Sequence, residues 1–251
     1  MKYFVNENSI VRQIWGSADT ILFIFAGAAA EFALNKAVDW LYFTGRLPAD
    51  PLGRLFSTVV YARKIIFSEL DEANRTIGQI TAIHKGVEVN RGAQIPAWAY
   101  RDVLFMLIYY SISSYEVLHR KLTDDEKAEA FDVFYRVGIG MGLDGLPTTY
   151  NDWLIMHREH LQQDIINSPL TADLYKQYKK HLGFIRYQLL KQVQVLIVPK
   201  RVNELLSLGK TRFLVPVLHL YKLSRIAKMD NFLIEAVLPN AYKQQLKSLT
   251  V

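Results

Sequence analysis

The stretch ANRTIGQITAIHKGV, residues 73–87, indicates the fold class of this chain. Its apolar side chains recur at steps of three and four residues, which is the spacing of one face of an α-helix. The positions on that face are Ala73, Ile77, Ile80, His84 and Val87. A histidine on such a stripe is expected to point toward the interior. Its ring nitrogens then need a hydrogen-bond partner, a carboxylate or a metal ion.

Helix signals continue along most of the chain. Capping residues, or a proline close to a capping residue, predict helix starts at Thr123, Thr149, Ser168 and Leu238. The best run of β-branched residues, VQVLIVP at 193–199, is short and follows directly on helical sequence. We therefore predict an all-α fold, a single-domain multi-helix bundle over residues 1–251.

The composition is that of a globular protein and limits the chemistry. The chain has 251 residues, of which 51% are hydrophobic and 22% charged, and it has no cysteine. Disulfides, thiolate zinc sites, iron–sulfur clusters and cysteine nucleophiles are therefore excluded. Any metal must be held by His, Asp, Glu or Tyr side chains, or must arrive inside a cofactor.

The amino terminus and the apolar stretches favour a cytoplasmic protein. Residues 1–16, MKYFVNENSIVRQIWG, lack the apolar centre of a secretory signal. Residues 18–34 and 103–112 are strongly apolar, but both are shorter than the roughly 20 residues that a membrane-spanning helix needs. We expect both stretches to be buried helices.

The last third of the chain is basic. Residues 172–251 hold 14 Lys and Arg against 4 Asp and Glu, whereas residues 1–171 hold 16 against 20. We interpret this region as the solvated face of amphipathic helices, with peripheral contact to an anionic membrane surface as the second interpretation. No zinc-finger, RNA-recognition or basic-zipper pattern is found, so no nucleic-acid partner is predicted.

Three glycines imitate a nucleotide-binding motif. Gly138, Gly140 and Gly142 lie in VGIGMGLDG, but a helix precedes them where a dinucleotide fingerprint requires a strand. We predict a helix end at this point.

Two histidines stand three residues apart in the sequence MHREH. His157 and His160 would supply two metal ligands if Glu159 or Asp164 converged on them. Because the surrounding pattern is largely polar, we predict that they lie on a solvated surface. The remaining histidines, His119, His181 and His219, are isolated, and no motif for a nucleophile or a general base accompanies them.

Four short motifs, taken in their order, carry a family resemblance. They are ADPLGRLFST at 49–58, IHKGV at 83–87, SYEVL at 114–118 and LPTTY at 146–150. Together they resemble the rubber oxygenase (latex clearing protein) and MpaB-type oxygenase family over about residues 10–165. Residues 166–251 are then predicted to form basic helices that pack on this core.

The resemblance implies an all-helical domain that holds one b-type haem. It implies that His84 is the axial iron ligand and that Arg54 and Thr58 form a polar pair near the haem, where they act in catalysis. Tyr61 shares a helical face with both, so we expect it to contact the cofactor. An inward guanidinium needs an anion such as a carboxylate or a haem propionate. The expected function is that of a haem-dependent oxygenase acting on a hydrophobic small molecule.

The chain also departs from the family pattern. Ser57 stands where rubber-cleaving members can carry lysine, and Glu88 follows His84 where a basic residue is usual. Two histidines of many relatives are replaced, one near residues 26–28 and one by Leu104. Only Glu31 and Asp39 are candidates for the base used in rubber cleavage. We therefore do not predict that this chain cleaves rubber.

Two alternative functions belong to other classes. One is a non-catalytic helical domain that binds a lipid or a hydrophobic metabolite without haem. The other is a peripheral membrane protein that works through the basic C-terminal third, at the inner face of the membrane.

Overall fold

A computed structural model describes residues 2–45, 49–211, 213–216, 218 and 221, with the backbone alone for Leu55. The helices are α1 (Ile10–Gly16), α2 (Ala18–Leu34), α3 (Val38–Phe43), α5 (Pro51–Phe67), α6 (Leu70–Arg91), α7 (Ala97–Leu118), α8 (Asp124–Gly140), α9 (Tyr150–Gln163), α10 (Pro169–Ile197) and α11 (Lys200–Leu206). These residues form no strand and only two isolated bridges. The predicted all-α single-domain bundle is confirmed.

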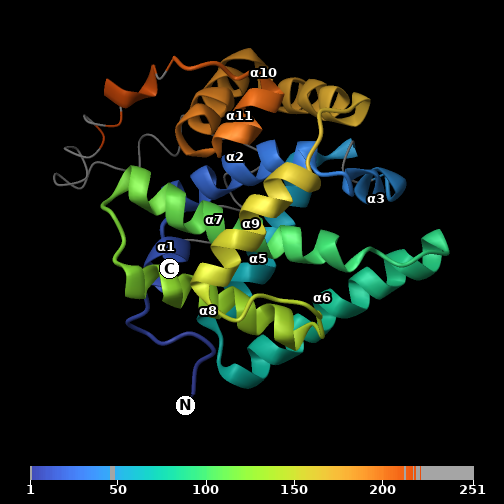
Figure 1. The fold of residues 1–251 in the computed structure, drawn as a ribbon, viewed down its shortest axis with the longest axis vertical. Coiled ribbons are helices and arrows are strands. Elements are labelled where there is room, and N and C mark those ends of the chain that lie inside the picture. The colour runs from blue at the N-terminus through green and yellow to red at the C-terminus, as the bar shows by residue number, and fades with distance from the viewer. Residues whose placement is uncertain (1, 46–48, 212, 217, 219–220, 222–251) are drawn as a thin grey trace.

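Helix α2 is the centre of the bundle. It packs against α7 on one side and against α10 on another (Figure 1). Its apolar side chains point in several directions, and Ile21, Ile24 and Leu34 are each no more than 1% exposed. A helix that is apolar all round must be enclosed by other helices, so residues 18–34 are buried as predicted.

The predicted helix boundaries are confirmed at several points. Thr123 and Ser168 cap α8 and α10 through capping boxes, and the Thr149 hydroxyl accepts a bond from the Asp152 backbone at the start of α9. Helix α8 ends at Gly140, and Gly142 then adopts φ 73°, a left-handed conformation that ends the helix. The helix start predicted at Leu238 lies outside the described residues.

Helix α6 lies along one edge of the molecule and is covered only in part (Figure 1). Ala73 and Ile77 are buried, as the stripe predicts, but His84 and Val87 further along are only half-buried. Ile83 is about half exposed. The interior orientation predicted for the whole stripe therefore holds for its first turns alone.

None of the described helices is, by itself, long and apolar enough to cross a membrane. Within the described ranges, α1 and α2 taken together reach the necessary length and composition, and they are bent by 85° relative to each other.

Candidate functional site

Arg54, Thr58 and His84 lie on two neighbouring helices. Arg54 and Thr58 are one turn apart on α5, which Asp50 begins by accepting a hydrogen bond from the Gly53 backbone. His84 lies on α6, the helix that packs along α5. The predicted polar pair is in contact, because Nη1 of Arg54 donates to the Thr58 hydroxyl at 3.0 Å.

The two ring nitrogens of His84 have different surroundings. Nδ1 lies 2.9 Å from the backbone oxygen of Ile80. A carbonyl can only accept, so Nδ1 carries the proton and Nε2 carries the lone pair. Nε2 forms no hydrogen bond with any described residue. This is the state of an imidazole that binds a metal through Nε2 and is held in place through its other nitrogen.

Burial and the neighbours of His84 favour the neutral ring. Burial lowers its pKa and outweighs the raising effect of the hydrogen bond to the Ile80 carbonyl; the positive charge of Arg54 lowers the pKa further, and Glu88 has a smaller raising effect. Tyr100 from α7 packs its ring edge-on against the imidazole, with centroids 5.2 Å apart. No local sequence pattern indicated this tyrosine, because it belongs to a different helix.

Tyr61 is half-buried on α5 and forms no hydrogen bond or ring contact with the other predicted site residues that the structure describes. Its predicted contact with a cofactor stays a prediction.

Two departures from the family pattern have local explanations. Ser57, in the place of a lysine, accepts a bond from Arg54 at 3.2 Å and donates to the Arg54 carbonyl. Glu88 accepts bonds from the Ile95 backbone at 2.9 Å and from the Tyr100 hydroxyl at 3.2 Å, and so ties the end of α6 to α7.

The prediction of a solvated surface for His157 and His160 is wrong. The two residues are 4% and 3% exposed, and they face α2 and α7. Trp153, His157, His160 and Asp164 follow one another at steps of four, three and four residues, so they share one face of α9 and its end. This spacing was a usable signal for a buried face, but the charged residues between them obscured it.

Glu31 of α2 meets these histidines in the core. Its Oε1 lies 3.1 Å from Nε2 of His160 and 3.9 Å from Nε2 of His157, and its Oε2 accepts a bond from the Tyr110 hydroxyl at 2.8 Å. Burial alone would raise the pKa of Glu31. The hydrogen bonds and charges of the two histidines outweigh burial and lower that pKa to about 2.

His160 is surrounded by carboxylates. Its Nδ1 lies 2.9 Å from Oδ1 of Asp102 and 3.7 Å from Oδ2 of Asp164. Burial would lower the pKa of His160, but Asp102 and Glu31 raise it to about 10. Oδ2 of Asp102 accepts a bond from the Asn35 side chain at 3.0 Å. Asp102, His160 and Asp164 have ligand atoms within 4.8 Å of one another, a grouping that could hold a metal ion.

Comparison with known families agrees with the helical fold and with the order of the motifs. The family described as ER-bound oxygenase mpaB/B'/rubber oxygenase, catalytic domain, matches residues 13–226. The chain belongs to this family. The match covers Arg54, Thr58 and His84 as well as the buried cluster. A search of curated proteins found no match.

The mpaB and rubber oxygenase family is one of oxygenase catalytic domains, and the resemblance of the motifs implies haem. The residues at His84 fit such a group. The pKa of the His84 ring is lowered, its Nδ1 is bonded to the Ile80 carbonyl, and its Nε2 has no hydrogen bond within the described part of the chain. Arg54 supplies a positive charge close to it. A histidine nitrogen can hold the haem iron, and a cation can pair with the haem carboxylates.

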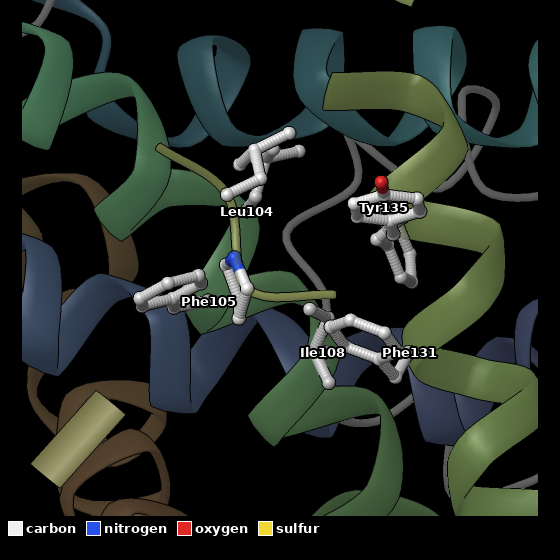
Figure 2. Close-up of a pocket in the computed structure, with 8 residues that line it drawn as sticks. Leu104, Phe105, Ile108, Phe131 and Tyr135 are labelled. Carbon is white, nitrogen blue, oxygen red and sulfur yellow. The ribbon is translucent and has the colours of Figure 1, made fainter. Parts of the chain in front are cut away.

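Two hollows in the structure of this family member lie away from His84. Figure 2 shows one between α7 and α8, where Leu104 and Phe105 face Phe131 and Tyr135; its volume is about 10 Å³, room for about one water molecule. A larger hollow of about 350 Å³ lies against α10 and α11. Neither is lined by His84, Arg54 or Thr58. Leu104, which replaces a histidine of many relatives, therefore serves apolar packing.

The two candidates for a general base are both held by other partners. Glu31 belongs to the buried cluster with His160. Asp39 forms an ion pair of 2.6 Å with Arg91, whose guanidinium also lies over the Trp40 ring. Neither carboxylate has a contact with His84 or Arg54 within the described ranges.

Proposed function

We propose that this protein is a haem-b-dependent oxygenase that acts on a hydrophobic substrate, with His84 as the axial iron ligand. The single observation that supports this most is the state of the His84 ring, with Nδ1 bonded to the Ile80 carbonyl and Nε2 left available. Membership of the oxygenase family supplies the reaction class.

Each residue of the site has a defined part in the proposal. His84 would hold the cofactor through Nε2, because Nδ1 faces the Ile80 carbonyl and leaves the lone pair on Nε2. Arg54 would pair with a cofactor carboxylate, and its bonds to Ser57 and Thr58 fix the orientation of its guanidinium. Thr58 presents a hydroxyl beside that cation, and Tyr61 follows on the same helix. When bound, the haem iron supplies the redox chemistry that activates oxygen.

The surroundings of the site suit an apolar substrate. Val60 of α5 and Ile83 of α6, on the two helices that carry the site, are each about half exposed. An apolar substrate or cofactor bound against these side chains would help to exclude water from the reacting atoms.

An absorption spectrum tests the proposal. Freshly purified protein, or protein given hemin, is expected to show a Soret band, and the pyridine haemochromogen is expected to be of the b type. His84→Ala is expected to remove or shift the band. His181→Ala, a matched change at a half-buried histidine of α10, is expected to leave it unchanged. A colourless protein that takes up no hemin, or an unchanged spectrum in His84→Ala, would refute the proposal and favour the haem-free lipid-binding alternative.

One observation favours peripheral membrane contact as a second function. Helix α10 is kinked at Gly183, and the next two side chains, Phe184 and Ile185, are 65% and 75% exposed. Lys179 and Lys180, one turn earlier, are also exposed. Exposed apolar side chains beside lysines are typical of segments that enter the interface of an anionic membrane. This would place the protein at the inner face of the membrane.

Sedimentation with vesicles tests this second function. Binding to phosphatidylserine vesicles is expected to exceed binding to phosphatidylcholine vesicles, to fall with salt, and to be lost in the double variant Phe184→Ser, Ile185→Ser. Equal binding by wild type and variant would refute it.

A further inference from the structure

The buried cluster at the end of α9 has an excess of negative charge. Asp102, Asp164 and Glu31 supply three carboxylates around His160. Within the part of the chain that the structure describes, no lysine or arginine side chain forms an ion pair with any of the three. Negative charge in a mostly buried cluster is costly, and a protonated His160 would offset only one of the three carboxylates, so the cluster can accept further positive charge.

The side of His160 that faces α2 is already satisfied. Nε2 lies 3.1 Å from Oε1 of Glu31, and an ionised carboxylate can only accept, so Nε2 donates its proton there. Glu31 is itself held by the Tyr110 hydroxyl at 2.8 Å. A histidine that donates one ring N–H to a carboxylate and turns its other nitrogen to a cation is the usual arrangement around protein-bound metals.

The opposite side of His160 is not satisfied by hydrogen bonds. Nδ1 is buried and lies 2.9 Å from Oδ1 of Asp102, yet the direction is not that of a hydrogen bond, and no other described atom bonds to it. His160 is only 3% exposed, so water does not readily replace the missing partner. Two adjacent ligand atoms on a metal with bonds of about 2.1 Å are themselves about 3 Å apart, which matches this separation.

We propose that Asp102, His160 and Asp164 bind one divalent transition-metal ion, separate from the haem proposed at His84. Oδ1 of Asp102 and Oδ2 of Asp164 lie 2.9 and 3.7 Å from Nδ1 of His160, and one ligand atom from each of the three residues lies within 4.8 Å of the others. The inference is independent of the proposed function, because it uses none of the residues at His84.

The donor set limits the identity of the metal. One imidazole with two carboxylates suits Mn²⁺, Fe²⁺ or Zn²⁺ better than the all-oxygen cation Ca²⁺ or the thiolate-preferring Cu⁺. The outer partners are also in place, since Asn35 donates to Asp102 at 3.0 Å and Glu31 accepts from His160. Outer partners of this kind orient the ligands and tune the affinity.

The position of the cluster indicates its role and its route of entry. Asp102 comes from α7, His160 from α9 and Asp164 from the C-cap of α9, and the outer partners Glu31 and Asn35 come from α2 and its end. The Asp164 side chain is 25% exposed, so the ion can enter from that side and keep water as its remaining ligands. The metal would join α7 to the end of α9, and the outer partners would tie both to α2.

Mn²⁺ titration tests the proposal. The whole chain is first dialysed against a chelator, and the free ion is then followed by its electron paramagnetic resonance signal during the titration. Wild type is expected to bind one equivalent, and the bound ion is expected to raise the melting temperature. Asp164→Asn is expected to weaken binding about tenfold or more, because a ligand is removed at a partly exposed position where folding tolerates the change. Glu159→Gln, which removes an exposed carboxylate from the same helix, is the matched control and is expected to bind like wild type.

The outcomes separate this inference from the proposal for His84. His84→Ala is expected to lose its Soret band and to keep its Mn²⁺ equivalent. If wild type binds neither Mn²⁺ nor Zn²⁺, or if Asp164→Asn and Glu159→Gln bind equally, the cluster is a network closed by a protonated His160 and the metal site is refuted.

Discussion

Replacing Glu31 by Gln is expected to lower the free energy of unfolding by about 3 kcal/mol. The change keeps the shape of the side chain and its acceptor for the Tyr110 hydroxyl, but it removes the charge that pairs with His160 at 3.1 Å. The pKa of Glu31 falls from 4.5 to about 2 on folding. At about 1.4 kcal/mol for each pH unit, this fall corresponds to about 3 kcal/mol. Removing one partner of a buried ion pair costs about 3 to 5 kcal/mol in other proteins, and the value for Glu31→Gln lies at the lower end of this range.

Urea denaturation of chelator-treated protein near pH 6 measures this loss, with unfolding followed by circular dichroism. Glu159→Gln is the matched control, because Glu159 is exposed on α9 and its neutralisation is expected to cost less than about 0.5 kcal/mol. A loss below about 1 kcal/mol in Glu31→Gln would refute the reasoning. It would mean that Glu31 is already neutral in the folded protein or that water reaches the cluster.

The same ion pair predicts a pH window. The pKa of Glu31 is lower in the folded chain, so its contribution is fully present above about pH 4.5 and is lost as the pH falls toward about 2. The pKa of His160 is raised to about 10, so its contribution is fully present below about pH 6.5 and is lost as the pH rises through about 10. The difference in stability between wild type and Glu31→Gln is therefore expected to be largest between about pH 4.5 and 6.5. A difference that does not vary with pH would contradict this assignment.

Three further predictions concern packing and helix ends. Gly27→Ala is expected to cost about 1 to 3 kcal/mol in chemical denaturation, because the added methyl group would collide with the buried Tyr110 ring. In Gly78→Ala on α6 the added methyl group meets open space, so the free energy of unfolding is expected to rise by about 0.5 to 1 kcal/mol. A fall of the same size would show that another part of the chain covers α6 at this position. Thr123→Ala removes the side-chain cap of α8 and is expected to lower the free energy of unfolding by about 1 kcal/mol. The shift of the urea midpoint measures this loss. An unchanged midpoint would show that Glu126 alone caps the helix.

The site at His84 was predictable in part. Arg54 and Thr58 are four residues apart, so helical geometry alone places them in contact, as the bond of 3.0 Å confirms. Their approach to His84 required the packing of α5 along α6. The contact of Tyr100 with His84 and the bonds of Glu88 came only from the structure, because they join α6 to α7.

The sequence by itself determined the fold class, most helix boundaries and the burial of α2, because helical periodicity, capping residues and apolar runs act over a few neighbouring residues. It did not determine that His157 and His160 are buried. Polar residues between them predicted a solvated helix, but tertiary packing turned their face toward Glu31 and Asp102. Glu31 precedes His157 by 126 residues, and Asp102 precedes His160 by 58 residues. A charged group can be buried only where distant helices bring a partner of opposite charge, and no local pattern contains that information.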